Sequence, residues 1–208
     1  QSFLCERHRT GKILSAGGIE QDVRRHGIEP RCKYIDNGRP YDQKGATMAL
    51  DTNVSEMLNT QINKELYSAY LYLTFADYYD ARGLKGFANW YVVQSQEEVD
   101  HARILRRYLL DNEVTPKMEA IAQPDLTFTD DLAPLKAALE HEQFITRSIG
   151  ECYDAAHKAA DLRTMKLLDW FVEEQGEEEV NAQEMITNME LFGTDPMGLY
   201  SLDREYQS

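Results

Sequence analysis

From residue 48 onward, apolar residues recur at alternating steps of three and four, which is the period of an amphipathic α-helix. Four long segments follow this pattern, and residues that start or stop helices bound each of them. We expect helices from a cap at Thr52 or Asn53 to about Asp80, from Leu84 to about Asn112, from Asp130 or Asp131 to about Ala159, and from Asp161 to about Leu191. A short fifth helix is expected between Gly198 and Gln207. The pattern predicts an all-α protein.

The links between these segments differ in length. The links after the first and third segments have only a few residues, whereas the link from Glu113 to Thr129 contains Pro116 and Pro124 and is about seventeen residues long. An extended chain covers about 3.3 Å per residue, so this link can travel the length of a bundle. Short, long and short links predict a four-helix bundle whose second and third helices run parallel and are joined by a crossover.

The first 47 residues differ in kind from the rest. They carry nine Lys and Arg against six Asp and Glu, while residues 48–208 carry thirteen against thirty. They show no helical or strand period, which is typical of unstructured sequence. Residues 44–47, Lys-Gly-Ala-Thr, can be encoded by a purine-rich ribosome-binding sequence just before a start codon at Met48. We therefore expect residues 1–47 to be translated upstream DNA, with a genuine disordered extension as the alternative, and residues 48–208 to be the domain.

The overall charge and composition narrow the classes of partner. A net charge of −14 disfavours nucleic acid as the main partner and favours cations. The sequence contains neither a long apolar run typical of a membrane span nor a secretory signal, so we expect no membrane association. Three widely spaced cysteines form no C-x-x-C pair, which is typical of a reducing compartment. We expect a cytoplasmic protein.

Metal-binding residue types interrupt each apolar stripe near its middle. They are Glu65 in the first helix, Glu98 and His101 in the second, Glu142 in the third, and Gln175 and Glu178 in the fourth. An unpaired buried carboxylate is very costly, so four helices would not each turn one inward without a cation to neutralise it. The i, i+3 spacing of Glu98 and His101 places a carboxylate and an imidazole on one helix face. The pattern therefore predicts a metal site at the centre of the bundle.

The ligand types favour a pair of iron ions, because carboxylates with one imidazole suit hard or borderline cations. Di-iron carboxylate bundles generally take one Glu from each of two helices and a Glu-x-x-His pair from each of the other two. The fourth helix, however, offers Gln175-x-x-Glu178 where a second Glu-x-x-His would stand. A neutral amide in place of an anionic ligand predicts a weaker, more labile second site, which suits iron that moves on after oxidation. In the acidic run of residues 173–179, Glu173 and Glu179 fall off the inward stripe and are expected to face water or neighbouring subunits.

Five sequence pieces, in order, resemble the bacterial non-haem ferritins over essentially all of residues 48–208. They are NKELYSAYLY (63–72), SQEEVDHARIL (95–105), EHEQFITRSI (140–149), FVEEQGEEE (171–179) and GLYSLDRE (198–205). The resemblance implies a ferritin-like four-helix bundle. It also implies a ferroxidase that oxidises Fe(II) with dioxygen or hydrogen peroxide and stores ferric oxyhydroxide in a shell of 24 subunits.

The resemblance also implies roles for individual residues. The first iron site would use Glu65, Glu98 and His101, with Glu98 bridging to a second site that uses Glu142 and has Gln175 beside it. An adjoining third site would use Glu97, Glu174, Glu177 and Glu178. Tyr72 would lie beside the centre, either donating an electron or steadying an intermediate, or else serving only in packing. Gly176 departs from the family pattern, which has a larger residue there, and a glycine within a helix favours a bend.

Three other functions fit parts of the pattern. A di-iron oxidase or peroxidase related to rubrerythrin would retain its iron, and a metal-free helical adaptor would not consume oxygen with Fe(II). A DNA-binding mini-ferritin would build its site at a subunit interface and carry a basic tail, whereas this chain ends in YSLDREYQS.

Bacterioferritins supply Glu-x-x-His from both halves of the bundle, and no recognisable haem site is present, so haem is not expected.

Overall fold

The structure is a computed structural model that describes residues 49–207. The prediction for residues 1–47 therefore lies outside the described residues. The described part of the chain forms five α-helices: α1 (Thr52–Ala81), α2 (Lys85–Asp111), α3 (Ala133–Lys158), α4 (Leu162–Phe192) and α5 (Pro196–Glu205). None of these helices is long and apolar enough to cross a membrane.

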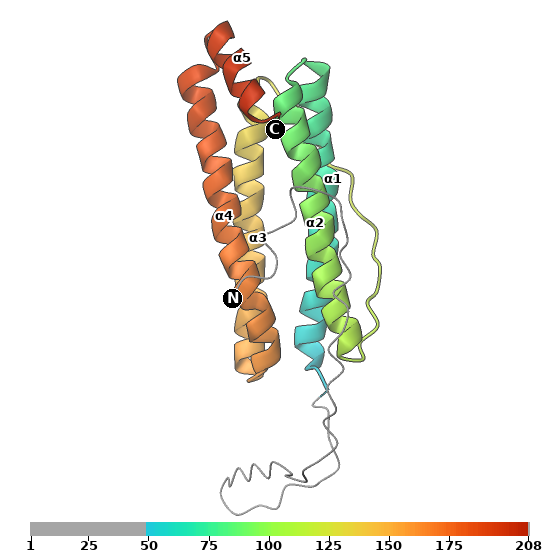
Figure 1. The fold of residues 1–208 in the computed structure, drawn as a ribbon. Helices are drawn as coiled ribbons and strands as arrows, with labels where there is room; N and C mark the ends of the chain where they lie inside the picture. Colours follow the sequence, from blue (N-terminus) through green and yellow to red (C-terminus); the bar gives the residue numbers. More distant parts are fainter. Residues whose placement is uncertain (1–48, 208) are drawn as a thin grey trace, which may run out of the picture. The chain divides into compact units, whose positions relative to one another are not determined.

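The four long helices form two antiparallel pairs (Figure 1). Helix α1 packs against α2 and also against α3, α3 packs against α4, and α5 packs against α2 and α4. The link from α2 to α3 follows the α1/α2 pair from one end of the bundle to the other, so α2 and α3 run parallel (Figure 1). Two side chains of α1 hold this link: Asn59 donates to Lys117 O at 3.1 Å, and Asn63 donates to Ala120 O at 3.3 Å. The predicted bundle with a crossover is confirmed.

The helix ends correct two expectations. Asp51, not Thr52 or Asn53, caps α1, because its carboxylate accepts a hydrogen bond from Val54 N at 3.1 Å. Helix α5 begins at Pro196, two residues before the predicted start, because the Asp195 carboxylate accepts from Gly198 N at 2.7 Å. The first misplacement follows from choosing a cap by residue type, since several neighbouring side chains could serve. The turn after α1 requires a glycine, because Gly83 has a φ of +82°.

Two hydrophobic clusters form the core. One occupies the end of the bundle where α1 begins and centres on Leu58, Leu105 and Leu168, while the other occupies the opposite end and centres on Phe75, Phe87 and Leu135. Along every long helix, the predicted metal ligands fall between residues of the first cluster and residues of the second. A layer of buried polar side chains therefore crosses the bundle near its middle.

Candidate metal centre

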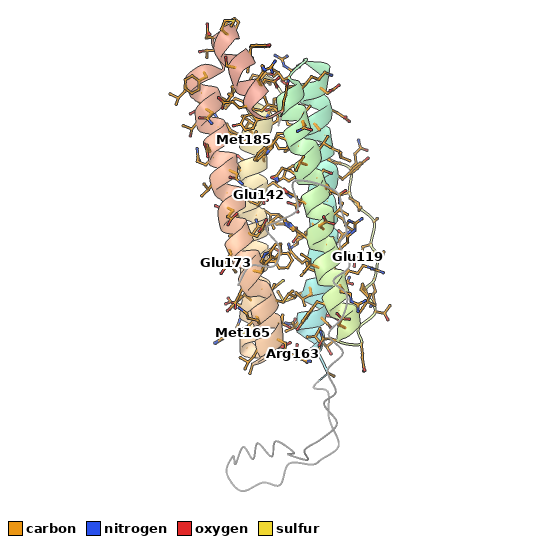
Figure 2. The ribbon with its side chains drawn as sticks, in the orientation of Figure 1. Glu119, Glu142, Arg163, Met165, Glu173 and Met185 are labelled. Atoms are coloured by element: carbon orange, nitrogen blue, oxygen red, sulfur yellow. The ribbon has the colours of Figure 1, made fainter. Side chains whose placement is uncertain are left out.

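Six of the predicted metal ligands are buried in the polar layer. They come from all four long helices: Glu65, Glu98, His101, Glu142, Gln175 and Glu178. Each follows the apolar stripe of its own helix, so the packing that buries the stripe also turns the ligand inward. Figure 2 shows Glu142 on α3 near the middle of the bundle, in contrast to the exposed Glu173 on α4.

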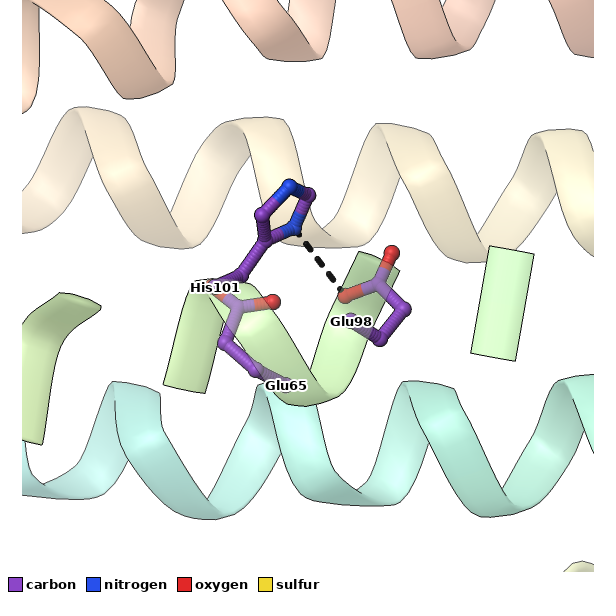
Figure 3. A group of neighbouring side chains, drawn as sticks. All are labelled: Glu65, Glu98 and His101. Atoms are coloured by element: carbon purple, nitrogen blue, oxygen red, sulfur yellow. Dashed lines mark ion pairs between the residues drawn. The ribbon is translucent and has the colours of Figure 1, made fainter. Parts of the chain in front are cut away.

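Three of these side chains form a compact cluster between α1 and α2. One ligand atom from each of Glu65, Glu98 and His101 lies within 4.8 Å of the other two, and all three side chains are buried (Figure 3). His101 Nδ1 lies 3.5 Å from Glu98 Oε2, as the i, i+3 spacing predicts. The rings of Trp170 and Phe171 pack edge-on against the imidazole, at 5.5 Å and 5.9 Å between centroids. A single cation can reach two carboxylates and an imidazole here.

Three buried carboxylate oxygens have no hydrogen-bond partner among residues 49–207: Glu65 Oε2, Glu98 Oε2 and Glu142 Oε1. A buried acceptor without a partner costs about 1–3 kcal/mol, and more when it is charged. The three atoms belong to three different helices that meet in the same layer. Bound cations would satisfy these atoms, so the donor set fits hard metal ions.

The electrostatics of the polar layer favour the protonated acids when no cation is bound. Burial raises the pKa of Glu65 well above its ordinary value, and the neighbouring Glu98 carboxylate raises it further. Burial raises the pKa of Glu98 to about 8 and that of Glu142 to about 7. Burial also raises the pKa of Glu178 to about 8, with a contribution from Glu142. A cation reverses this preference, because it attracts the ionised form of each ligand.

The amide of Gln175 is hydrogen-bonded to Glu142. Its Nε2 atom donates to Glu142 Oε2 at 2.9 Å and lies 3.4 Å from the Glu142 carbonyl oxygen. This contact orients the Glu142 carboxyl and leaves its Oε1 atom without a partner in the described chain. Glu142 does not join the compact cluster of Glu65, Glu98 and His101, so the second iron site stays a prediction built on Glu98, Glu142 and Gln175.

The residues predicted for a third site are less buried than the others. Glu97 and Glu177 are exposed and Glu174 is partly buried, whereas Glu178 is buried. Glu174 Oε1 lies 3.9 Å from His101 Nε2, which places it between the compact cluster and the surface. The structure brings Glu174 and Glu178 to the edge of the polar layer, and the third site itself stays a prediction.

Tyr72 is buried and lies at the edge of the polar layer. It lines a small cavity together with Glu142 and Glu178, and its ring packs against Tyr91 and His141 at centroid distances of 5.6 Å and 6.1 Å. The position agrees with the expected place beside the centre. Its role in electron transfer stays a prediction.

The acidic run of α4, residues 173–179, differs in two ways from the expectation from sequence. Glu173 is exposed as expected, but Glu179 is partly buried and accepts a hydrogen bond from Thr146 Oγ1 at 2.5 Å, so it helps to join α4 to α3. The sequence period could not show this contact, because it depends on the neighbouring helix. Gly176 is exposed, and α4 continues through it as one α-helix.

The sequence reasoning missed a set of polar residues beside Glu65. Gln61 is completely buried and donates from Nε2 to Glu65 Oε1 at 2.9 Å, and the buried Ser148 donates to Gln61 Oε1. Gln61 could have been found, because it lies four residues before Glu65 on the same helix face. Ser148 carried no such signal, because a small hydroxyl is common at any buried helix position.

The comparisons with known proteins agree with this geometry. The ferritin-like domain family matches residues 55–192, which is more than half of the chain. Relatives described as bacterial non-heme ferritins include one from Staphylococcus aureus, 32% identical and covering 75% of this chain and 94% of its own length. Another, from Campylobacter jejuni, is 34% identical and covers 74% of this chain and 93% of its own. The fold and the carboxylate–imidazole site thus define a four-helix protein of the ferritin-like class.

A solved structure gives the same result. The open-pore ferritin of the archaeon Archaeoglobus fulgidus superposes with a TM-score of 0.74 at 39% sequence identity, covering 76% of this chain and 96% of that one. The chain belongs to the ferritin family.

Proposed function

We propose that this chain is an iron-storage ferritin: its bundle oxidises Fe(II), and its copies assemble into a hollow shell that holds ferric oxyhydroxide. The observation that carries the proposal is the set of three buried carboxylate oxygens without hydrogen-bond partners in the described residues, two of which belong to Glu65 and Glu98, the carboxylates that cluster with His101. Membership of the ferritin family supports the same assignment.

In this proposal the residues first bind ferrous iron as a substrate. Glu65, Glu98 and His101 take the first ion, and the carboxylates release their protons as it enters. Glu142 takes the second ion with Glu98 shared between the two, and Tyr72 borders this second position. Each ferrous ion gives one electron to dioxygen, which takes up two protons and becomes hydrogen peroxide. Because anionic carboxylates stabilise ferric iron more than ferrous iron, they favour this oxidation.

The neutral amide of Gln175 makes the second position the weaker one. It occupies Glu142 Oε2 and contributes no negative charge, so a ferric ion is held there by fewer anions than in the first position. Glu174 is partly buried and Glu177 and Glu97 are exposed, and these acids would take up iron that leaves the centre. Hydrolysis of the released ferric ion then gives ferric oxyhydroxide and three protons. A shell of 24 copies would enclose that mineral.

Stopped-flow absorbance after mixing the apoprotein with Fe(II) and oxygen tests the proposal. We expect Glu98→Ala and His101→Ala to abolish the rapid phase of oxidation and to leave the helical content unchanged. Glu173→Ala is the matched control, because it removes an exposed acid from α4, and it should keep the wild-type rate. Wild-type rates in both site variants would refute the assignment.

Counting iron per subunit after aerobic loading separates a store from an enzyme that keeps its iron. A ferritin accumulates far more iron than its binding sites hold, and the loaded particle keeps the mass of a large shell in light scattering. An iron content that stops at two or three ions per subunit would favour the rubrerythrin-like alternative instead.

A further inference from the structure

A chain of hydrogen-bonded side chains leads from Lys64 to the metal ligand Glu65. Lys64 Nζ donates to Ser148 Oγ at 2.5 Å, Ser148 Oγ donates to Gln61 Oε1, and Gln61 Nε2 donates to Glu65 Oε1 at 2.9 Å. Ser148 comes from α3 and the other three residues from α1. Gln61, Ser148 and Glu65 are all buried, while Lys64 is partly buried and lies 5.1 Å from the centre of the Phe144 ring.

The lysine fixes the direction of every bond in this chain. An ammonium group can only donate, so Ser148 Oγ accepts from it and is left with its own hydrogen for Gln61. Gln61 must then present its carbonyl oxygen to Ser148, which turns the amide NH₂ group toward Glu65. Without the lysine the serine could accept from the amide instead, and the amide could turn over. Its carbonyl oxygen would then face the Glu65 carboxylate, and two acceptors repel each other.

The orientation of the Gln61 amide matters because the two oxygens of Glu65 have different surroundings. Oε1 accepts from Gln61, whereas Oε2 has no hydrogen-bond partner in the described residues, and the Glu65 carboxylate offers one oxygen to the cluster with Glu98 and His101. Outer partners that orient a ligand typically change metal affinity by about 10–100-fold. An amide that holds Oε1 in place therefore also sets where Oε2 points.

We propose that Lys64 is a positioning residue of the iron centre: acting through Ser148 and Gln61, it fixes the amide as a donor to Glu65 and so aims the free oxygen of Glu65 at the first metal position. The inference rests on the proposed function, because it takes Glu65 as an iron ligand. Lys64 itself touches no metal position, and its effect passes through one hydroxyl and one amide.

The test is calorimetric titration of the full-length apoprotein with Zn(II), and with Fe(II) under anaerobic conditions. Lys64→Met keeps an unbranched side chain one atom shorter but removes the donor, so it should weaken the tightest site about tenfold while leaving the stoichiometry unchanged. Ser148→Ala should have a similar effect. The Lys64→Met/Ser148→Ala double variant should be no weaker than either single variant, because both break the same chain. Lys64→Arg retains a donor-only cation and should restore most of the affinity.

Lys136→Met is the control for loss of a lysine, since Lys136 lies on the exposed part of α3 and its ammonium is 3.7 Å from Glu190. It should bind like the wild type. Wild-type affinity in Lys64→Met, or additive losses in the double variant, would overturn the positioning role alone. A wild-type protein that binds neither ion at the Glu65 position, with Glu65→Gln indistinguishable from it, would overturn the proposed function and this inference together.

Discussion

Asp203 of α5 caps the first turn of α2 at Gly86. The Asp203 carboxylate accepts hydrogen bonds from Gly86 N at 2.8 Å and Phe87 N at 3.2 Å, and it is buried. The contact is so close that a Cβ atom on Gly86 would lie 1.6 Å from the carbonyl oxygen of Asp203. A cap from a residue 117 positions away along the chain thus joins the C-terminal helix to the bundle.

Gly86→Ala should therefore lower stability more than an ordinary helix substitution. Alanine normally favours helices, but here its methyl group would force α5 away from α2, at a cost of about 1–3 kcal/mol. Asp203→Ala should cost about 1 kcal/mol through loss of the cap. Thermal unfolding followed by circular dichroism measures both, with Ser201→Ala on the exposed side of α5 as the control. A rise in melting temperature for Gly86→Ala would contradict this account of the contact.

The Gln175–Glu142 contact predicts opposite effects on stability and on metal binding. Gln175→Glu replaces a donor 2.9 Å from Glu142 by a second acid, so the apoprotein should melt at a lower temperature. The added carboxylate should also bind metal, so Zn(II) affinity at the second position should rise about tenfold, and release of ferric iron should slow. Calorimetry gives the affinity and a ferric chelator gives the release rate. Faster release from Gln175→Glu than from the wild type would count against the proposed role of Gln175.

Stability of the apoprotein should fall as pH rises through the neutral range. Burial raises the pKa of Glu98 and Glu178 to about 8 and that of Glu142 to about 7, above the ordinary value of a glutamate. Between about pH 5 and pH 8 the folded apoprotein therefore binds more protons than the unfolded chain, and the free energy of unfolding decreases with pH. The stabilising contribution of the protonated acids is complete below the unfolded pKa and is lost as pH passes the folded pKa.

Zn(II) should show the opposite trend, because it displaces those protons. The increase in melting temperature on adding Zn(II) should grow from about pH 5 to pH 8. Calorimetric melts across this range, with and without Zn(II), measure both slopes. Glu98→Gln should make the apoprotein slope shallower, and an apoprotein that becomes more stable between these pH values would contradict the proposed burial of the acids.

The crossover link should open when its anchor on α1 is removed. Asn59 holds the link twice, since Nδ2 donates to Lys117 O at 3.1 Å and Oδ1 accepts from Lys117 N at 2.7 Å. Asn59→Ala should leave the melting temperature almost unchanged but increase tryptic cleavage after Lys117 several-fold, because local opening controls proteolysis. Thr60→Ala is the control, as Thr60 bonds only within its own helix, to Glu56 O. Mass spectrometry of the fragments identifies the cut, and equal cleavage in the two variants would contradict the anchoring role.

The sequence predicts the bundle and the burial of the six candidate ligands, because both follow from one periodic pattern. Each ligand interrupts an apolar stripe, so the packing of Leu58 or Phe171 also determines where Glu65 or Gln175 points. Hydrogen bonds that join different helices leave no periodic pattern in the sequence. The bond from Thr146 to Glu179, the bond from Ser148 to Gln61 and the cap from Asp203 each depend on how two helices are placed in space. The choice of Asp51 over Thr52 as a cap is local, yet residue type alone does not decide it.

The core is divided into two hydrophobic clusters, one at each end of the bundle, so binding and release of cations in the polar layer change the structure only locally. Under the proposed function, the protein must keep its fold both when the centre is empty and when cations have displaced the protons of its acids. The two hydrophobic clusters hold the helices together on both sides of the polar layer. The free-energy cost of an empty centre is therefore confined to a few polar side chains. The packing of the helices can therefore stay the same whether or not cations occupy the centre.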